Sequence, residues 1–418
     1  MKLLKLLACL LLPAQALTAQ VNADSVRITL QRLEQGLKQK DITLLTHQCF
    51  APDYSISTYT TPSADGLLRT IAGGVEFEAV HPDSELMEAE RDTAYLYARF
   101  ATRGQQKEQR SVIAFNRQAR ILFIDYFDQL FGDSRYRPSR LVATLPFRLD
   151  DGAIVLQARL NKSDRPLAFL LDTGADGMAI RRTLADSLGL TTSHAQDANV
   201  VGGRKTVSIS AGNTLRLTDS LSLEGQNIAL FEQVRHGLDG IIGLNLLKRY
   251  ITRVDFDRQT LSLYSFGNYA FPRTGTLVPV QTPQSLILLP SELNLTGRKS
   301  IAGRFIMDTG ANYELIAFSR FVRKNRLLLS GFKPEGSGST VSLGHATPVY
   351  YGHAASLQVG DIKVQNLPVT LQASNGNDQS APNGPDGSVG IGFFGHYNFT
   401  VDLLRKVVHL EERSRTSR

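Results

Sequence analysis

The chain has 418 residues, of which 42% are hydrophobic and 20% charged, the composition of a soluble globular protein with two or three domains. Its formal net charge is +7, and this excess is spread along the chain apart from the basic end at residues 413–418. The pattern favours an ordinary solvated surface and disfavours nucleic-acid binding.

Residues 1–19 are predicted to be a secretory signal peptide, because two lysines precede a short apolar run that ends in small residues. Cleavage after Ala19, with Ala16 as the other candidate, would leave an exported protein that begins at Gln20 and is periplasmic or secreted. Cys9 offers a lipoprotein processing site, the less favoured alternative because the segment before it is short. The apolar run of this segment is too short to span a bilayer, and no later run is long enough.

The chain has two cysteines, Cys9 and Cys49. If Cys9 leaves with the signal peptide, no intrachain disulfide is possible, and Cys49 is expected to be a small buried apolar residue. The eight histidines contain no pair with the spacing of metal ligands. We therefore expect neither a metal nor a cofactor.

Residues 20–132 are predicted to form an α+β accessory domain, and residues 133–143 a linker. Apolar residues at helical spacing precede a series of β-rich runs; the helices are expected at 26–37 and 42–49, and the runs at 75–81, 85–90, 94–102, 110–116 and 120–127. This order of elements resembles the nuclear-transport-factor-2-like domains, which often accompany enzymes. No acid–base pair is recognisable, so a permanent non-catalytic module is expected, with a removable pro-segment as the alternative.

Residues 144–411 are predicted to be mostly β and to contain two copies of one fold, at 144–270 and 271–411, before a basic tail at 412–418. In each copy an apolar strand leads into Asp-Thr-Gly-Ala, at Asp172–Ala175 and at Asp308–Ala311. A helix, a Gly-rich stretch and a closing motif follow in both copies; they are expected at 179–190 and 315–325, at 200–204 and 335–339, and at 239–243 and 386–390. A polar run at 374–384 lengthens the second copy as a predicted surface loop.

The repeat predicts a site built from two carboxylates, Asp172 and Asp308, one from each copy. Two carboxyl groups in close contact cannot both ionise without a large cost, so they would share one proton. The ionised member can take a proton from water while the protonated member donates to a substrate carbonyl oxygen. This chemistry is hydrolysis without a metal and without a covalent intermediate.

The residues after each aspartate are predicted to support the pair. Thr173 and Thr309 can hydrogen-bond across the two copies and hold both loops in register. Gly174 and Gly310 allow the two backbones to approach closely, and their amides can donate to the carboxylates.

These motifs, with Ile241-Ile-Gly243 downstream, resemble the retropepsin-like branch of the aspartic proteases. The resemblance covers residues 144–411 and implies a β-barrel lobe for each copy, with peptide cleavage in the cleft between the lobes and a protein or peptide as substrate. It also implies mobile hairpin flaps, placed at 201–205, with Gly202 and Gly203, and at 336–339. Further candidate substrate contacts are the residues that close each motif: Ala175, Asp176, Ala311 and Asn312. Turn polarity explains Asp176 and Asn312 equally well.

Two features depart from the family pattern. Both aspartates lie in one chain, whereas retropepsin lobes usually pair as homodimers, so a monomer is plausible. Ala175 and Ala311 stand where pepsins carry a hydroxyl residue that hydrogen-bonds the pair. Without those donors the pKa values of the two carboxyls should be raised, and we expect a less acidic optimum than pepsin-like enzymes have.

These motifs have other interpretations. A single Asp-Thr-Gly is often only a turn, but its duplication in matching surroundings favours a paired site. A non-catalytic protein that binds peptides or glycans in the same cleft is the alternative function. Gly390–Gly395 matches a dinucleotide-binding pattern, which the repeat already explains. The acidic residues Asp239, Asp255, Asp386 and Asp402 are expected to lie in turns or at strand ends.

Overall fold

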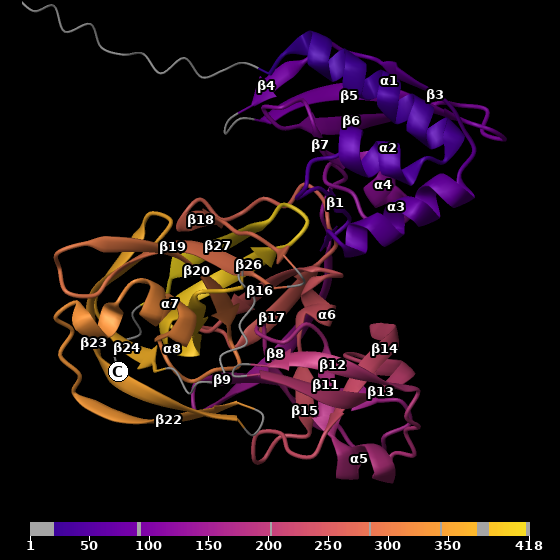
Figure 1. Ribbon diagram of the computed structural model, residues 1–418. Helices are drawn as coiled ribbons and strands as arrows, with labels where there is room; N and C mark the ends of the chain where they lie inside the picture. Colours follow the sequence, from indigo (N-terminus) through magenta and orange to yellow (C-terminus); the bar gives the residue numbers. More distant parts are fainter. Residues whose placement is uncertain are drawn as a thin grey trace, which may run out of the picture. The chain divides into compact units, whose positions relative to one another are not determined.

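The computed structural model describes residues 21–89, 93–200, 203–283, 286–342, 345–373 and 384–414 (Figure 1). The predicted signal peptide, residues 201–202 and nearly all of the polar run at 374–384 lie outside these ranges. The chain forms two compact units, Met1–Ile56 with Ala64–Leu130 and Ser57–Ser63 with Phe131–Arg418. No described helix is long and apolar enough to cross a membrane.

The first unit packs helices against an antiparallel sheet. Its helical segments are α1 (Ala23–Gln39), α2 (Ile42–Leu44), the π-helical turn η1 (Leu45–Cys49), α3 (Ser63–Gly74) and α4 (Asp125–Leu130). Its sheet has the order β3 (Phe77–Pro82), β5 (Thr93–Thr102), β6 (Gln109–Phe115), β7 (Ile121–Ile124), with β4 (Met87–Ala89) on β5. The short strand β1 (Ser55–Ile56) also belongs to this unit, whereas β2 (Tyr59–Thr60) belongs to the second. The two predicted helices are confirmed, and each β-rich run contains a strand. The run at 120–127 was predicted too long, because residues 125–127 begin helix α4, and α3 was missed.

Helix α1 illustrates how the sequence forms this unit. The Asn22 side chain accepts a hydrogen bond from the Ser25 amide, which caps the first turn, and Lys40 ends the helix in the left-handed conformation. Leu33 and Leu37, one turn apart, are fully buried against the sheet core. Cys49 is buried and free, as predicted.

Residues 57–63 require a correction, because the sequence placed them in the N-terminal domain. They belong to the second unit. The Thr58 hydroxyl donates to the Lys248 carbonyl at 3.1 Å, and the Thr60 hydroxyl donates to the Thr282 carbonyl at 2.7 Å. Contacts this distant in sequence leave no local pattern, which explains the error.

The second unit is mostly β and consists of two lobes with the same strand connections, as predicted. The first lobe contains β8 (Leu141–Asp150), β9 (Ala153–Leu160), β10 (Leu167–Leu171), β11 (Met178–Arg181), α5 (Arg182–Ser187), β12 (His194–Val200), β13 (Gly203–Arg216), β14 (Ser222–Phe231), β15 (Gly240–Ile242), α6 (Leu244–Leu247), β16 (Ile251–Asp255) and β17 (Thr260–Tyr264). Figure 1 shows these elements in magenta to salmon.

The second lobe repeats this series. It contains β18 (Thr276–Pro279), β19 (Leu288–Asn294), β20 (Ser300–Asp308), β21 (Leu315–Ala317), α7 (Ser319–Lys324), the 3-10 turn η3 (Leu327–Leu329), β22 (Gly336–Ser342), β23 (His345–Val359), β24 (Ile362–Gln372), β25 (Gly387–Gly390), α8 (Ile391–Phe394), β26 (Tyr397–Asp402) and β27 (Val407–Glu412). Strand β10 pairs with β15 in parallel, and β20 pairs with β25 in the same way. Likewise β11 pairs with β14 and β21 with β24.

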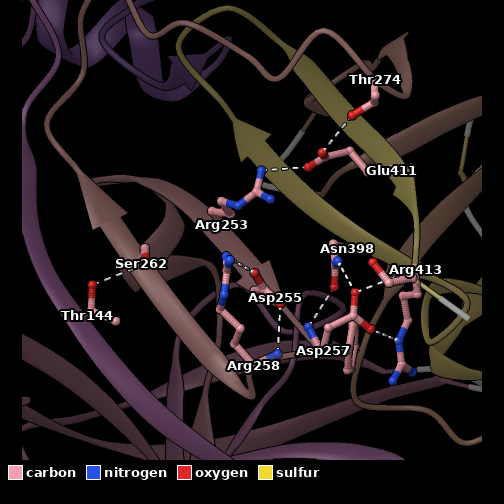
Figure 2. Close-up of polar contacts among 12 residues, drawn as sticks. Thr144, Arg253, Asp255, Asp257, Arg258, Ser262, Thr274, Asn398, Glu411 and Arg413 are labelled. Atoms are coloured by element: carbon pink, nitrogen blue, oxygen red, sulfur yellow. Dashed lines mark hydrogen bonds and ion pairs between the residues drawn. The ribbon is translucent and has the colours of Figure 1, made fainter. Parts of the chain in front are cut away.

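The lobes are joined by one continuous run of strands, β8-β17-β16-β26-β27-β18, with three strands from each lobe. At its centre β16 and β26 are antiparallel, and Arg253 pairs with Thr400. Figure 2 shows the polar contacts along this sheet: Asn398 of β26 donates to the Asp257 carboxylate at 2.8 Å, and Arg413 donates to the same carboxylate at 3.0 Å. The lobes are therefore joined by backbone hydrogen bonds between β16 and β26 and by a polar cluster of Asp257, Asn398 and Arg413.

Two details of the repeat differ from the prediction. The predicted helices at 179–190 and 315–325 begin as strands β11 and β21, because their first residues pair with β14 and β24. The Gly-rich stretch at 336–339 begins a strand and does not form the tip of a hairpin. A Cβ on Gly336 would lie 2.2 Å from the Tyr351 hydroxyl, so this glycine makes room for a neighbouring phenol.

Candidate active site

Each aspartate follows a buried strand that is fixed by a parallel partner. Asp172 directly follows the carboxyl end of strand β10, and its amide donates to the Ile242 carbonyl at 2.9 Å. Strand β20 ends at Asp308, which pairs with Gly390 of β25. The apolar residues before each aspartate are buried, so both loops leave the sheet from a rigid base.

The two loops are locked together by their threonines, as predicted. The Thr173 amide donates to the Thr309 hydroxyl at 3.1 Å, and the Thr309 amide donates to the Thr173 hydroxyl at 3.0 Å. Each hydroxyl in turn donates at 2.7 Å to a carbonyl of the other lobe, Thr173 to Met307 and Thr309 to Leu171. Both threonines are fully buried, so these four bonds fix the separation of the loops.

The carboxylates lie against the glycines of the opposite lobe. A Cβ built on Gly174 would be 2.8 Å from Cγ of Asp308, and one built on Gly310 would be 2.4 Å from Cγ of Asp172. Within each loop the glycine amide donates to its own aspartate, at 2.8 Å for Gly174 and 3.1 Å for Gly310. The structure thus brings Asp172 and Asp308 into one site between the lobes.

Both carboxyl groups have raised pKa values. Burial raises the pKa of Asp172, and the neighbouring charge of Asp308 raises it further. Burial also raises the pKa of Asp308, against hydrogen bonds that lower it. Burial and mutual repulsion of this kind favour a state in which one carboxyl is protonated and the other ionised, which is the state that acid–base hydrolysis requires.

The surroundings of the two aspartates are not equivalent. The Ser388 hydroxyl lies 3.2 Å from Oδ2 of Asp308, and the Tyr313 hydroxyl lies 3.4 Å from the same oxygen. Among the described residues, no hydroxyl donates to Asp172. Ala175 and Ala311 supply no hydroxyl, as expected, and the pKa values of both carboxyls are raised. Asp308 nevertheless has hydroxyl donors, because Ser388 approaches it from β25 and Tyr313 from its own loop.

Neither residue was identified from the sequence, although both break the repeat. Ser388 stands where the first copy has Ile241, and Tyr313 stands where the first copy has Gly177. A residue-by-residue alignment of the two copies would have marked both positions as asymmetric. Only the structure shows that both hydroxyls face one carboxylate.

The other candidate substrate contacts have structural partners. The carbonyls of Ala175 and Ala311 accept the first amides of α6 and α8, at 2.8 and 2.9 Å. The Asp176 carboxylate forms an ion pair with Lys248, and the Asn312 amide donates to Asp151 at 2.7 Å. Gly203 begins β13 and pairs with Val200, whereas Gly202 lies outside the described residues.

The remaining acidic residues of the repeat lie in turns and at strand ends, as predicted. Asp239 receives two hydrogen bonds from Arg165, at 2.8 and 2.9 Å, and its equivalent Asp386 accepts from the Arg304 amide at 2.9 Å. Asp255 and Asp402 each accept the amide three residues ahead, at 2.9 and 3.0 Å. Within the ranges that the structure describes, no three His, Cys, Asp or Glu side chains could hold a metal ion.

A cavity of about 200 Å³ lies in the second lobe. Tyr313 is one of its lining residues, and the hydroxyl of the same residue donates to Asp308. The rest of the wall combines apolar and acidic side chains, among them Leu315, Val369, Tyr351, Glu314 and Glu335.

Residues 156–246 match the sequence model of a family described as aspartyl protease. The resemblance inferred from the repeats is confirmed for the first lobe. The matched segment contains Asp172, Thr173, Gly174 and the closing motif of the lobe. No curated protein matches the chain. Among solved structures, the crystal structure of the aspartic proteinase from Irpex lacteus matches at 14% identity and a TM-score of 0.44, covering 67% of this chain and 99% of that chain.

Proposed function

We propose that this protein is an aspartic endopeptidase in which Asp172 and Asp308 share one proton and activate water against a peptide carbonyl. One observation carries the proposal: each carboxylate lies against the glycine of the opposite lobe, and the two threonines hold this geometry. The aspartyl protease match over residues 156–246 supports the same reaction class.

The reaction follows from the charge state of the pair. The ionised carboxylate removes a proton from water as the water oxygen bonds to the peptide carbon, and the protonated carboxyl gives its proton to the carbonyl oxygen. In the second step each carboxyl exchanges its role. The carboxyl that took the proton from water gives it to the peptide nitrogen, and the C–N bond breaks. The other carboxylate takes a proton from a hydroxyl of the intermediate. The products are a carboxylic acid and an amine, and the pair regains its starting state.

The test is a peptide-library digest with the wild type and the variants Asp172→Asn and Asp308→Asn. We expect cleavage by the wild type and a loss of at least about a hundredfold in each variant, because each removes one of two cooperating groups. Asp186→Asn, on the exposed face of α5, is the matched control and should cleave like the wild type. Equal cleavage by all four proteins, or by none, would contradict the proposal.

A further inference from the structure

Each carboxylate accepts a hydrogen bond from the glycine amide of its own loop, and Asp172 also faces the Ala175 amide, but hydroxyl donors reach only Asp308. The amides of Gly174 and Gly310 supply one matched bond to each. The hydroxyls of Ser388 and Tyr313 both face Oδ2 of Asp308. The two lobes share one fold, but the surroundings of their two carboxylates are therefore different.

We propose that Ser388 and Tyr313 are positioning residues that place the shared proton on Asp172 and keep Asp308 ionised. Asp308 then takes the proton from water, and Asp172 donates to the carbonyl oxygen. This assignment rests on the proposed function and deepens it, because the fold alone leaves the two roles interchangeable.

The physical reason lies in which form of the carboxyl each hydroxyl stabilises. A hydroxyl that donates to a carboxylate stabilises the anion, and such charge-assisted bonds are stronger than neutral ones. Tyr313 remains a donor across the working range, because burial and the adjacent Asp308 charge raise the pKa of its phenol. The Ser388 side chain is almost fully buried, so water competes little for its proton.

Ser388 also has a clear choice between acceptors. Its hydroxyl lies 3.4 Å from the Ile306 carbonyl and 3.2 Å from Oδ2 of Asp308. A charged acceptor at the shorter distance is the stronger of the two. The first copy offers no counterpart, because Ile241 replaces the serine and Gly177 replaces the tyrosine. Asp172 is thus the better site for the proton.

The first experiment compares pH profiles of kcat/KM for the wild type, Ser388→Ala and Tyr313→Phe. Loss of a donor makes ionised Asp308 less stable, so the acid limb should move upward by about one pH unit for Ser388→Ala and by less for Tyr313→Phe, whose bond is longer. Ser388→Thr retains a hydroxyl and should restore the wild-type limb. A limb that stays in place in both variants would overturn the assignment.

Two matched controls separate this effect from a general loss of packing. Ser291→Ala removes a buried hydroxyl that donates to the Leu289 carbonyl in the same lobe, and Tyr397→Phe removes a phenol that is mostly buried there. Neither is placed near the pair, so neither should move the acid limb. A shift of equal size in the controls would show that the pH profile reports stability alone and would overturn the assignment.

A second measurement locates the proton directly and does not depend on cleavage activity. The ¹³C shifts of the aspartate carboxyl carbons in the wild type, assigned by comparison with Asp172→Asn and Asp308→Asn, show which carboxyl is protonated between the two steps of the titration. We expect the protonated signal at Asp172, and a signal divided equally or centred on Asp308 would overturn the proposal. Because this readout is independent of cleavage, an inactive wild type with the proton on Asp172 would sink the proposed function and leave the asymmetry standing.

Discussion

Each glycine that follows the Asp-Thr pair lies in tight contact with the carboxylate of the other lobe. Gly310 is the tighter case, since a Cβ there would lie 2.6 Å from both oxygens of Asp172. The carboxylate cannot move away freely, because it is held by the Gly174 amide and packed against Asp308. The glycines thus decide whether the two acids can meet.

We therefore expect Gly310→Ala to reduce kcat/KM by at least about a hundredfold, since misplacement of reacting groups by an ångström has effects of that size. The measurement is steady-state cleavage of the best peptide from the library digest. Gly177→Ala is the matched control, because it lies in the equivalent loop and an added Cβ would meet nothing within 4 Å. Comparable activity of Gly310→Ala and Gly177→Ala would show that close approach of the loops is not required.

The charge of the pair should also limit stability at high pH. Burial and the neighbouring charge of Asp308 raise the folded-state pKa of Asp172 to about 8, well above its unfolded value of about 4. A group with a raised folded pKa contributes its full stability below the unfolded pKa and loses it as pH rises through the folded pKa.

Asp172→Asn removes this titration, so its thermal midpoint should exceed that of the wild type by a few degrees near pH 9 and match it near pH 4. Thermal unfolding at the two pH values measures the difference, with the exposed Asp186→Asn as control. A variant that is less stable than the wild type at pH 9 would contradict the raised pKa.

At the scale of elements, the sheet between the lobes depends on one side chain that bridges β26 and the turn after β16. The Asn398 side chain accepts from the Phe256 amide at 2.7 Å and donates to Asp257 at 2.8 Å (Figure 2). Arg413, directly after the last strand, adds a bond to the Asp257 carboxylate at 3.0 Å. The polar cluster therefore joins segments that the chain order keeps far apart.

Asn398→Ala would leave the buried Phe256 amide without its acceptor, which costs about 1–3 kcal/mol. We expect the thermal midpoint of the second unit to fall by a few degrees. Asn325→Ala is the control, because its side chain donates to the Phe321 carbonyl within one lobe at 3.0 Å and leaves no buried amide unpaired. An equal effect of the two substitutions would mean that the bridge between lobes has no special role.

The same elements show what sequence could predict. The aspartate, threonine and glycine positions were found because duplication exposes them, and the apolar runs before them predict buried strands correctly. Strand β11 was assigned to a helix, because residues 178–181 become a strand only by pairing with β14, about fifty residues away. Ser388 breaks the apolar pattern of the closing motif, but its reach to Asp308 depends on the parallel pairing of β25 with β20.

At the scale of the whole molecule, the second unit places both halves of the site in one chain. Strands β16 and β26 pair directly across the lobes, with Arg253 opposite its repeat equivalent Thr400. A homodimer of identical lobes would be constrained to identical surroundings for its two aspartates. Joining two copies in one chain frees them to differ, and the donors around Asp308 are such a difference.

The single-chain site gives a prediction about mixtures. Asp172→Asn carries an intact Asp308, and Asp308→Asn carries an intact Asp172, so a site assembled between two chains would regain both acids in a mixed dimer. Within one chain each variant lacks one acid permanently, because the four threonine bonds join loops of the same molecule. Equimolar mixing, also after unfolding and refolding together, should therefore restore no cleavage above the sum of the separate variants. The wild type refolded alongside serves as the control for recovery, and a return to about a quarter or more of its activity would show that the lobes exchange between chains.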